Sequence, residues 1–587
     1  MVQSLHDNGI GVIMDVVYNH VADAGNFCFN QIVPGYFSRI HDDGSYQSNS
    51  GCGNDTASER SMVSKYIVDS VLYWNTEYHI DGFRWDLVGL IDYETINAVM
   101  AAVHEVNPDI IFYGEGWEMC SWTTKDEGEW ASDPYSKKMT IQPNDKLVNT
   151  EAGVFAFFND TIRNVIHGGV FTATDKGFVC GNLSDRTKPT VPDSYMAYSQ
   201  WGSNSERVDT PLQTVNHASC HDNYTLFDNF TVDALDLNGL ELSAENAALV
   251  AEQAAMYNNL AAAYYITAQG VPFIHAGEEM LRSKPSVDAE NNFVFDHNSY
   301  SSGDGVNAFK WGQLANELNA ASYEYYKGLI AFRKAHPALR MTEQAEILSA
   351  MSALETGSND VIAILNKGGN GENAEILTVI NVGADVAVTL PEGQWNVYVN
   401  ADIAGTEVIE TVSGSVTVSA TSAMILVKAE ETEPEVEVVA TGWSGYTTWV
   451  LTSDGTLTVS PTEERWNGKC NMANYHKING VLTLPWSAYA EQITKVVIEE
   501  GVNAVGQMAF YELPNLREVV LADSVEEIRN YAFKNTTSLT TINLEVVAAI
   551  REGAFYGCSG LENLTFAEGV VIEAFAFSKT PYASMNP

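Results

Sequence analysis

At 587 residues, the sequence is too long for a single hydrophobic core and predicts about three or four domains. Hydrophobic residues make up 45% of the chain and charged residues 18%, which excludes a largely disordered protein. Asp and Glu outnumber Lys and Arg by 76 to 31, and the net charge of −45 argues against nucleic acids and anionic membranes as partners. This charge balance suits a neutral ligand such as a sugar.

Residues 1–340 alternate short apolar runs with helical patterns, which predicts an α/β architecture of parallel strands and helical crossovers. Several apolar runs end in charged residues, as in a barrel whose site lies at the C-terminal ends of its strands. We therefore predict a barrel domain. Its candidate strands are 11–18, 81–86, 109–115, 153–159, 214–220 and 271–277.

The remaining sequence predicts two smaller domains joined by a linker. Short apolar segments separated by turn residues indicate an antiparallel β-sandwich over 341–428. A glutamate-rich stretch around a proline indicates a solvated acidic linker over 429–440. In 441–587, Ala-Phe pairs recur at spacings of 23, 22 and 22 residues, which is typical of a leucine-rich-repeat solenoid.

Four polar clusters interrupt the apolar strands of the first domain: DVVYNH (15–20), DGFRWD (81–86), YGEGW (113–117) and SCHDN (219–223). A barrel would bring them to one rim. Glycoside hydrolysis with retention uses such acids, because one carboxylate attacks the anomeric carbon and a second, protonated one donates to the leaving oxygen. Arg84 lies two residues before Asp86, on the same strand face, where it could keep that aspartate ionised.

The four clusters, in this order, resemble the signature regions of the α-amylase superfamily of glycoside hydrolases. Other stretches resemble type I pullulanases, the α-1,6 debranching enzymes: VPGYFSRIHDDGSYQSNSGCGNDTASERSMV, GFRWDLVGL, YGEGW and NSYSSGDGVNAFKW. This resemblance implies that Asp86 is the nucleophile, Glu115 the general acid/base and Asp222 the residue that stabilises the transition state. It also implies a sugar subsite lined by Asp15, His20, Arg84 and His221.

Taken singly, several of these residues also have ordinary structural interpretations. Asp15, Asp81 and Glu278 would each be expected to be solvated or to cap a helix. Trp85 should point away from Arg84 and pack in the core. Trp117 could pack in the core or stack on a sugar face, and we include it among the substrate-binding candidates.

The resemblance also implies a (β/α)8-type barrel, of which the first two strands have no counterpart in this sequence. Six strands cannot simply close, because strand number, tilt and stagger are linked in a barrel. We therefore expect the sequence to be an N-terminally truncated fragment of a longer enzyme, with impaired activity.

The expected function is cleavage of α-1,6 branch linkages in pullulan, starch or glycogen, with an α-glucan as partner. Two alternatives are a glucan branching or transglycosylating enzyme of the same superfamily, and a non-catalytic surface protein that binds through its repeats. The stretch AFYGCSGLENLTF resembles bacterial leucine-rich repeats of surface proteins, which favours a protein or cell-surface partner and an extracellular or surface location.

Cofactors and metals are not required by this mechanism. Calcium sites are common in the superfamily, but the sequence has no EF-hand loop, so calcium stays an open alternative. The seven cysteines are scattered without a CxxC pair, and no zinc site or disulfide framework is expected. No apolar run reaches the roughly 18 residues that a membrane span needs.

Overall fold

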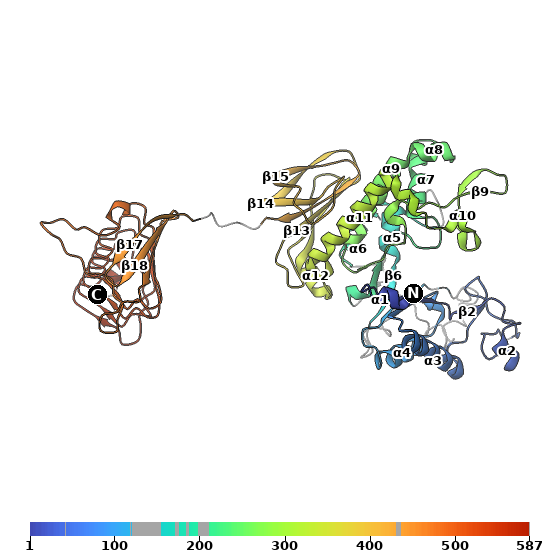
Figure 1. The fold of residues 1–587 in the computed structure, drawn as a ribbon, viewed down its shortest axis with the longest axis horizontal. Coiled ribbons are helices and arrows are strands. Elements are labelled where there is room, and N and C mark those ends of the chain that lie inside the picture. The colour runs from blue at the N-terminus through green and yellow to red at the C-terminus, as the bar shows by residue number, and fades with distance from the viewer. Residues whose placement is uncertain are drawn as a thin grey trace. The chain divides into compact units, whose positions relative to one another are not determined.

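The computed structural model forms two compact units, residues 1–429 and 430–587 (Figure 1). It describes residues 1–41, 43–117, 119, 154–170, 175–183, 187–197, 210–429 and 436–585. Residues 430–435, half of the predicted acidic linker, lie outside this set, as does Cys120. Residues 438–440, which the sequence assigned to the linker, instead begin strand β17 (Val438–Ser444), where Val438 pairs with Thr452. Paired β-branched residues explain that difference.

A parallel sheet of six strands organises the N-terminal half of the first unit, in the order β1-β4-β5-β6-β7-β8. All five strand pairings are parallel, and the strands lie inside the six predicted ranges. Among the described residues, β1 and β8 each pair with one neighbour, so the sheet is open and no closed barrel forms. The strands are β1 (Ile13–Val16), β4 (Gly82–Trp85), β5 (Ile111–Gly114), β6 (Phe155–Asn159), β7 (Thr214–Asn216) and β8 (Val271–Pro272).

Helices α3 (Ser61–Tyr78) and α4 (Tyr93–His104) pack side by side against this sheet (Figure 1). Phe83 and Trp85 of β4 are buried in the hydrophobic core that the two helices form with the sheet. Because side chains alternate along a strand, Arg84 between them points to the opposite face. Trp85 thus packs in the core as predicted, and β4 presents a single cation to the other face of the sheet.

The strands between residues 351 and 428 form a second, antiparallel sheet in the order β11-β12-β13-β16-β14-β15. The predicted antiparallel strands are present, and the long strand β14 pairs with both β15 and β16, so all six strands belong to one hydrogen-bonded sheet. The strands are β11 (Met351–Leu354), β12 (Val361–Asn366), β13 (Ile376–Asn381), β14 (Val386–Val399), β15 (Glu410–Val418) and β16 (Ser422–Lys428).

One hydrophobic core connects this antiparallel sheet to the helices that precede it. Helices α9 (Ala251–Thr267) and α11 (Glu317–Ala335) lie beside the sheet (Figure 1). Their buried apolar side chains belong to the same core as those on one face of the sheet. The Tyr195 hydroxyl contacts the Thr378 hydroxyl at 3.0 Å across this core. The predicted boundary at 340/341 therefore does not separate two compact units, because residues on both sides of it share a core.

The second unit begins with three antiparallel strands and continues as two parallel ladders. One ladder adds β20 (Lys495–Ile498), β22 (Glu518–Leu521) and β24 (Thr541–Ile542); the other contains β21 (Ala504–Val505), β23 (Glu527–Ile528), β25 (Ala549–Ile550) and β26 (Val571–Ile572). The phenylalanines of the four Ala-Phe pairs stack with ring centroids 5.1–5.2 Å apart, and they are Phe510, Phe533, Phe555 and Phe577. Each Ala-Phe repeat in the sequence thus contributes one ring to this stack.

Candidate active site

Arg84 is the centre of the candidate site. Its Nη1 atom lies 2.8 Å from Asp15 Oδ1 and 3.1 Å from Asp86 Oδ1, and its Nη2 atom donates to Glu115 Oε1. The parallel register explains this grouping, because it places Asp15 of β1 directly beside Arg84 of β4. One guanidinium group therefore gathers carboxylates that follow or belong to three neighbouring strands.

Glu115 is held at the end of β5 by the backbone as well as by Arg84. Its second carboxylate oxygen accepts a hydrogen bond from the Leu87 amide at 2.9 Å, and its own amide donates to the Trp85 carbonyl at 3.1 Å. Gly89 donates its amide to the Glu115 carbonyl at 3.1 Å. A Cβ atom at Gly89 would lie 2.0 Å from the Trp117 carbonyl oxygen, so this close approach requires glycine.

Asp86 is fixed from its other side by Asn19. The Asn19 amide is fully buried and donates to Asp86 Oδ2 at 2.9 Å and to the Asp86 carbonyl at 2.5 Å. The Asn19 side-chain oxygen contacts His20 Nδ1, which orients that imidazole. His20 thus joins the carboxylate cluster through Asn19, a residue inside the DVVYNH motif to which the sequence assigned no role.

The electrostatics of the site separate Glu115 from its neighbours. Burial raises the pKa of Glu115 to about 7; Arg84 and the Leu87 amide act in the opposite direction, and the charges of Asp86 and Asp222 raise the pKa further. Burial opposes the charge on Arg84, but the carboxylates around it raise its pKa above the ordinary value. Near neutral pH, a protonated glutamic acid can therefore lie beside a permanent cation.

Asp222 and His221 lie on the segment that follows β7. Their side chains are 61% and 58% exposed, and His221 Nε2 lies 3.7 Å from Asp222 Oδ1. Asp222 makes this contact rather than one with Arg84, but it is near enough to Glu115 for its charge to raise that pKa. The structure thus brings Asp15, Arg84, Asp86 and Glu115 into direct contact and leaves Asp222 exposed beside them.

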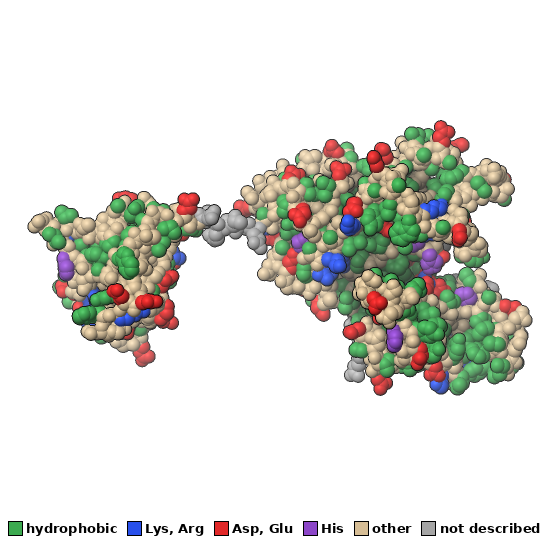
Figure 2. All heavy atoms as spheres, viewed as in Figure 1, with side chains coloured by type: hydrophobic (Ala, Val, Ile, Leu, Met, Phe, Trp, Pro, Cys, Tyr) green, Lys and Arg blue, Asp and Glu red, His purple; other side chains and the backbone are tan. Residues whose placement is uncertain are grey.

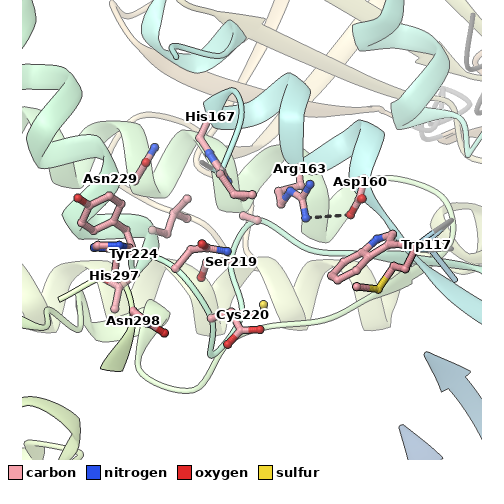
Figure 3. Close-up of a pocket in the computed structure, with 17 residues that line it drawn as sticks. Trp117, Asp160, Arg163, His167, Ser219, Cys220, Tyr224, Asn229, His297 and Asn298 are labelled. Atoms are coloured by element: carbon pink, nitrogen blue, oxygen red, sulfur yellow. Dashed lines mark ion pairs between the residues drawn. The ribbon is translucent and has the colours of Figure 1, made fainter. Parts of the chain in front are cut away.

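Asp222 is one of the residues that line a cavity of about 650 Å³. Figure 3 shows this cavity. Trp117 lines one end of it beside the ion pair between Asp160 and Arg163, whose atoms are 2.9 Å apart. Tyr224 and His297 line the other end, with ring centroids 5.6 Å apart. Aromatic faces and polar groups in one cavity are a suitable lining for a sugar ligand.

Three acids were each expected to be solvated or to cap a helix, and the structure places them in different environments. Asp15 is exposed as expected but bonds to Arg84. Asp81 accepts from the Val12 amide at 2.6 Å and contacts His6 at 2.7 Å, at the start of β4 and away from the cluster. Glu278 is buried, contrary to the expectation, because the hydroxyls of Tyr265, Tyr326 and Ser219 solvate its carboxyl group in place of water.

The described part of the chain shows neither a group of metal-ligating side chains nor a helix suited to a membrane. Within it, no three His, Cys, Asp or Glu side chains form a group that could hold a metal ion. No helix in these ranges combines the length and apolar character needed to cross a membrane. Acidic side chains are distributed over the visible face of each unit (Figure 2). Calcium binding stays a prediction.

Comparison with known proteins identifies pullulanases as relatives of the first unit. The chain is 34% identical over 354 residues to the pullulanase of Bacillus subtilis (strain 168), which covers 60% of this chain and 44% of that protein. The solved pullulanase from Bacillus acidopullulyticus matches 73% of this chain and 47% of its own, at 33% identity and a TM-score of 0.61. A pullulanase structure from Paenibacillus barengoltzii in complex with maltohexaose and α-cyclodextrin matches 73% of this chain and 60% of its own, at 31% identity and a TM-score of 0.61.

Pullulanase homologues therefore cover most of this chain, and the predicted resemblance is confirmed. The chain spans less than two thirds of the length of each of these relatives. In the second unit, a family model described as a BspA type leucine rich repeat region matches six copies within residues 487–586. This match agrees with the repeat that the Ala-Phe spacing predicted.

Proposed function

We propose that the first unit carries a retaining α-glucan debranching activity, with Asp86, Glu115 and Asp222 as its acids. The observation that carries the proposal is the bridging of Asp86 and Glu115 by the single guanidinium of Arg84. The pullulanase relatives support an α-1,6 linkage, and the maltohexaose named with the Paenibacillus barengoltzii structure supports an α-glucan substrate.

In this proposal Asp86 is the nucleophile. Arg84 and Asn19 each donate to one of its carboxylate oxygens, which holds the carboxylate in a fixed orientation. It attacks the anomeric carbon and forms a covalent glycosyl ester as the glycosidic C–O bond breaks. The leaving glucan keeps the glycosidic oxygen.

Glu115 supplies the proton in the first step and removes one in the second. With its pKa raised to about 7, its carboxyl group donates a proton to the departing oxygen. It then takes a proton from water as that water attacks the anomeric carbon and releases Asp86. Asp222 stabilises the positive charge that develops on the sugar, while Asp15, His20, Arg84 and His221 bind the sugar ring and Trp117 stacks on a neighbouring one.

The direct test is hydrolysis of pullulan by the full chain, measured as new reducing ends and identified products. We expect Asp86→Asn to lower kcat on the order of 10³-fold or more, because it removes the nucleophile. Glu115→Gln should lower it about 10²–10⁴-fold. Asp109→Asn is the matched control, since this exposed aspartate precedes β5 on the same sheet and touches none of the site.

Each outcome separates the proposal from its alternatives. Absence of hydrolysis by the unmodified chain would contradict the activity, and an undiminished rate for Asp86→Asn would contradict the residue assignment. Longer or newly branched products from a glucan would indicate a transglycosylating enzyme, because a sugar hydroxyl would then replace water in the second step.

For the second unit, we propose binding of protein or cell-surface material by the repeats. The support is the match to a leucine rich repeat region over residues 487–586. Retention of bacterial cell-wall material by the full chain, and its loss on deletion of residues 487–586, would test this role separately from hydrolysis.

A further inference from the structure

The backbone around Asp222 has little regular structure of its own. The segment 219–224 follows the three-residue strand β7 and precedes helix α7 (Leu226–Leu237) without forming a helix or strand. The side chain of Asp222 is 61% exposed, so packing of that side chain cannot hold it in place. A residue that must meet a reacting sugar needs its position fixed by other groups.

Lys284 forms hydrogen bonds that can fix this segment. Its Nζ atom lies 2.7 Å from the Asn223 carbonyl oxygen, 3.4 Å from the His221 carbonyl oxygen and 3.2 Å from Ser299 Oγ. The two carbonyls belong to the residues on either side of Asp222. An ammonium group has three donors, so this arrangement uses all of them.

Lys284 is itself firmly anchored. The residue is 1% exposed, its amide donates to Asp228 Oδ2 at 2.8 Å, and its carbonyl accepts from the Asp296 amide at 2.8 Å. Asp228 belongs to the first turn of α7 and also accepts from Ser283 Oγ. The ammonium is therefore fixed relative to the helix that follows the Asp222 segment.

The backbone conformation of Asn223 explains why its contact with Lys284 matters. Asn223 has φ +62°, in the left-handed region, which asparagine adopts more readily than most residues but which still needs support. The carbonyl of that same residue accepts the shortest Lys284 contact. At the other end of the segment, the Ser219 hydroxyl donates to the buried Glu278 carboxyl at 2.7 Å. The segment is thus tied down at both ends.

The charge of Lys284 also interacts with the carboxylates near it. Burial lowers the pKa of Lys284 and nearby Arg282 lowers it further, whereas Asp228, Asp296 and Asp222 raise it. A buried ammonium whose hydrogen bonds end on neutral oxygens, here two carbonyls and one hydroxyl, leaves part of its field available to nearby groups. Asp222 is one of the carboxylates on which the charge of Lys284 acts.

We propose that Lys284 is a positioning residue that holds Asp222 at the candidate site by bonding the carbonyls on both sides of it. This inference rests on the proposed function for the role of Asp222, but the hold on the backbone is independent of that function. Lys284 touches no reacting atom and acts through residues 221–223.

The test compares Lys284→Met with the unmodified full chain. Methionine keeps an unbranched apolar stem and removes the three donors and the charge. We expect the amides of 221–224 to exchange with solvent at least about tenfold faster, because the local opening loses charge-assisted hydrogen bonds. Lys334→Met is the matched control, since Lys334 is exposed on α11 and its ammonium contacts none of these residues.

Kinetics on pullulan distinguish positioning of Asp222 from general damage. We expect Lys284→Met to lower kcat roughly 10–100-fold with KM little changed, and to cause almost no further loss in an Asp222→Asn background. Equal losses in both backgrounds, or unchanged exchange at 221–224, would overturn the proposal.

Two further measurements keep the outcomes separable. If Lys284→Met does not fold, Lys284→Arg keeps the charge but replaces the compact donor by a planar fork, and it should still accelerate exchange at 221–224. Unchanged exchange in that variant would overturn the proposal. If the unmodified chain does not hydrolyse pullulan, the proposed function fails, and the exchange measurement still decides whether Lys284 holds the segment.

Discussion

The candidate site and the repeat ladders use opposite construction principles. At the site, each contact occurs once: Arg84 meets three different carboxylates, and Asn19 fixes one of them. In the ladders, one contact recurs, with Phe533 stacked at 5.1 Å on the ring before it and at 5.2 Å on the ring after it. A site of unique contacts fails as a whole when one is lost, whereas a ladder distributes its stability over equivalent rungs.

The largest effect is expected when one phenylalanine ring is removed from the stack. Phe533→Ala should lower the free energy of unfolding of the second unit by about 3–5 kcal/mol, because a fully buried ring stacked on both sides is lost. Native-state hydrogen exchange of residues 504–550 in the full chain would measure it.

Phe575→Ala is the matched control for this change, since that ring is 64% exposed. Pullulan hydrolysis should be the same in both variants. A large loss of hydrolysis in Phe533→Ala would show that the two constructions are not energetically independent.

The second prediction concerns the pH dependence that the site builds into Glu115. Because its pKa in the folded protein, about 7, lies above the ordinary 4.5, folding favours the protonated form. Its stabilising contribution is present below about pH 4.5 and is lost as pH rises towards 7, by about 3 kcal/mol in total. The free energy of unfolding of wild type minus that of Glu115→Gln should fall by this amount across the window.

Chemical denaturation of both proteins at several pH values checks this prediction, and Glu105→Gln controls for the substitution at an exposed position. The same titration should lower kcat/KM above about pH 7, since the proton donor is then ionised. A pH-independent difference between the two proteins would mean that Glu115 does not titrate in this range.

A smaller effect is expected where the backbone around Glu115 leaves no room. Gly89→Ala would place a Cβ atom 2.0 Å from the Trp117 carbonyl oxygen, so the segment that carries Glu115 must move. We expect a loss of about 1–3 kcal/mol in stability and a clear fall in kcat. Thermal unfolding and pullulan kinetics measure the two effects.

Gly305→Ala provides the comparison for this substitution, because its Cβ would meet no atom within 4 Å and the position is helical. If Gly89→Ala behaves like Gly305→Ala in both measurements, the close approach at Gly89 is not required for the site.

The smallest expected effect lies on the surface of the ladders. Lys534 Nζ lies 4.9 Å from the ring centroids of Tyr531 and Tyr556, in neighbouring repeats. Lys534→Met should cost about 0.5–1 kcal/mol. A double-mutant cycle with Tyr556→Leu, read by hydrogen exchange, would isolate the contact, and a coupling energy near zero would show that the Lys–Tyr pairs add nothing to the stacked rings.

The arrangement along the chain could be predicted because it depends on local patterns. Apolar runs marked the six parallel strands, and the alternation of side chains placed Arg84 and Asp86 on one face with Trp85 on the other. The repeat period predicted the ladders for the same reason: each unit carries its own signal. The connections among the strands of residues 351–428, and the start of β17 within the predicted linker, depend on strand pairing that the local pattern does not contain.

By itself, the sequence determined the order of the elements, the four polar clusters and the spacing of the repeats. Only the tertiary structure decided that one arginine joins acids from three strands and that Glu278 is buried among hydroxyls. It also decided that Lys284 bonds the carbonyls on either side of Asp222. The physical reason is distance along the chain. Arg84 and Asp15 are 69 residues apart, and Lys284 and Asn223 are 61 apart, so only strand register and packing bring them together.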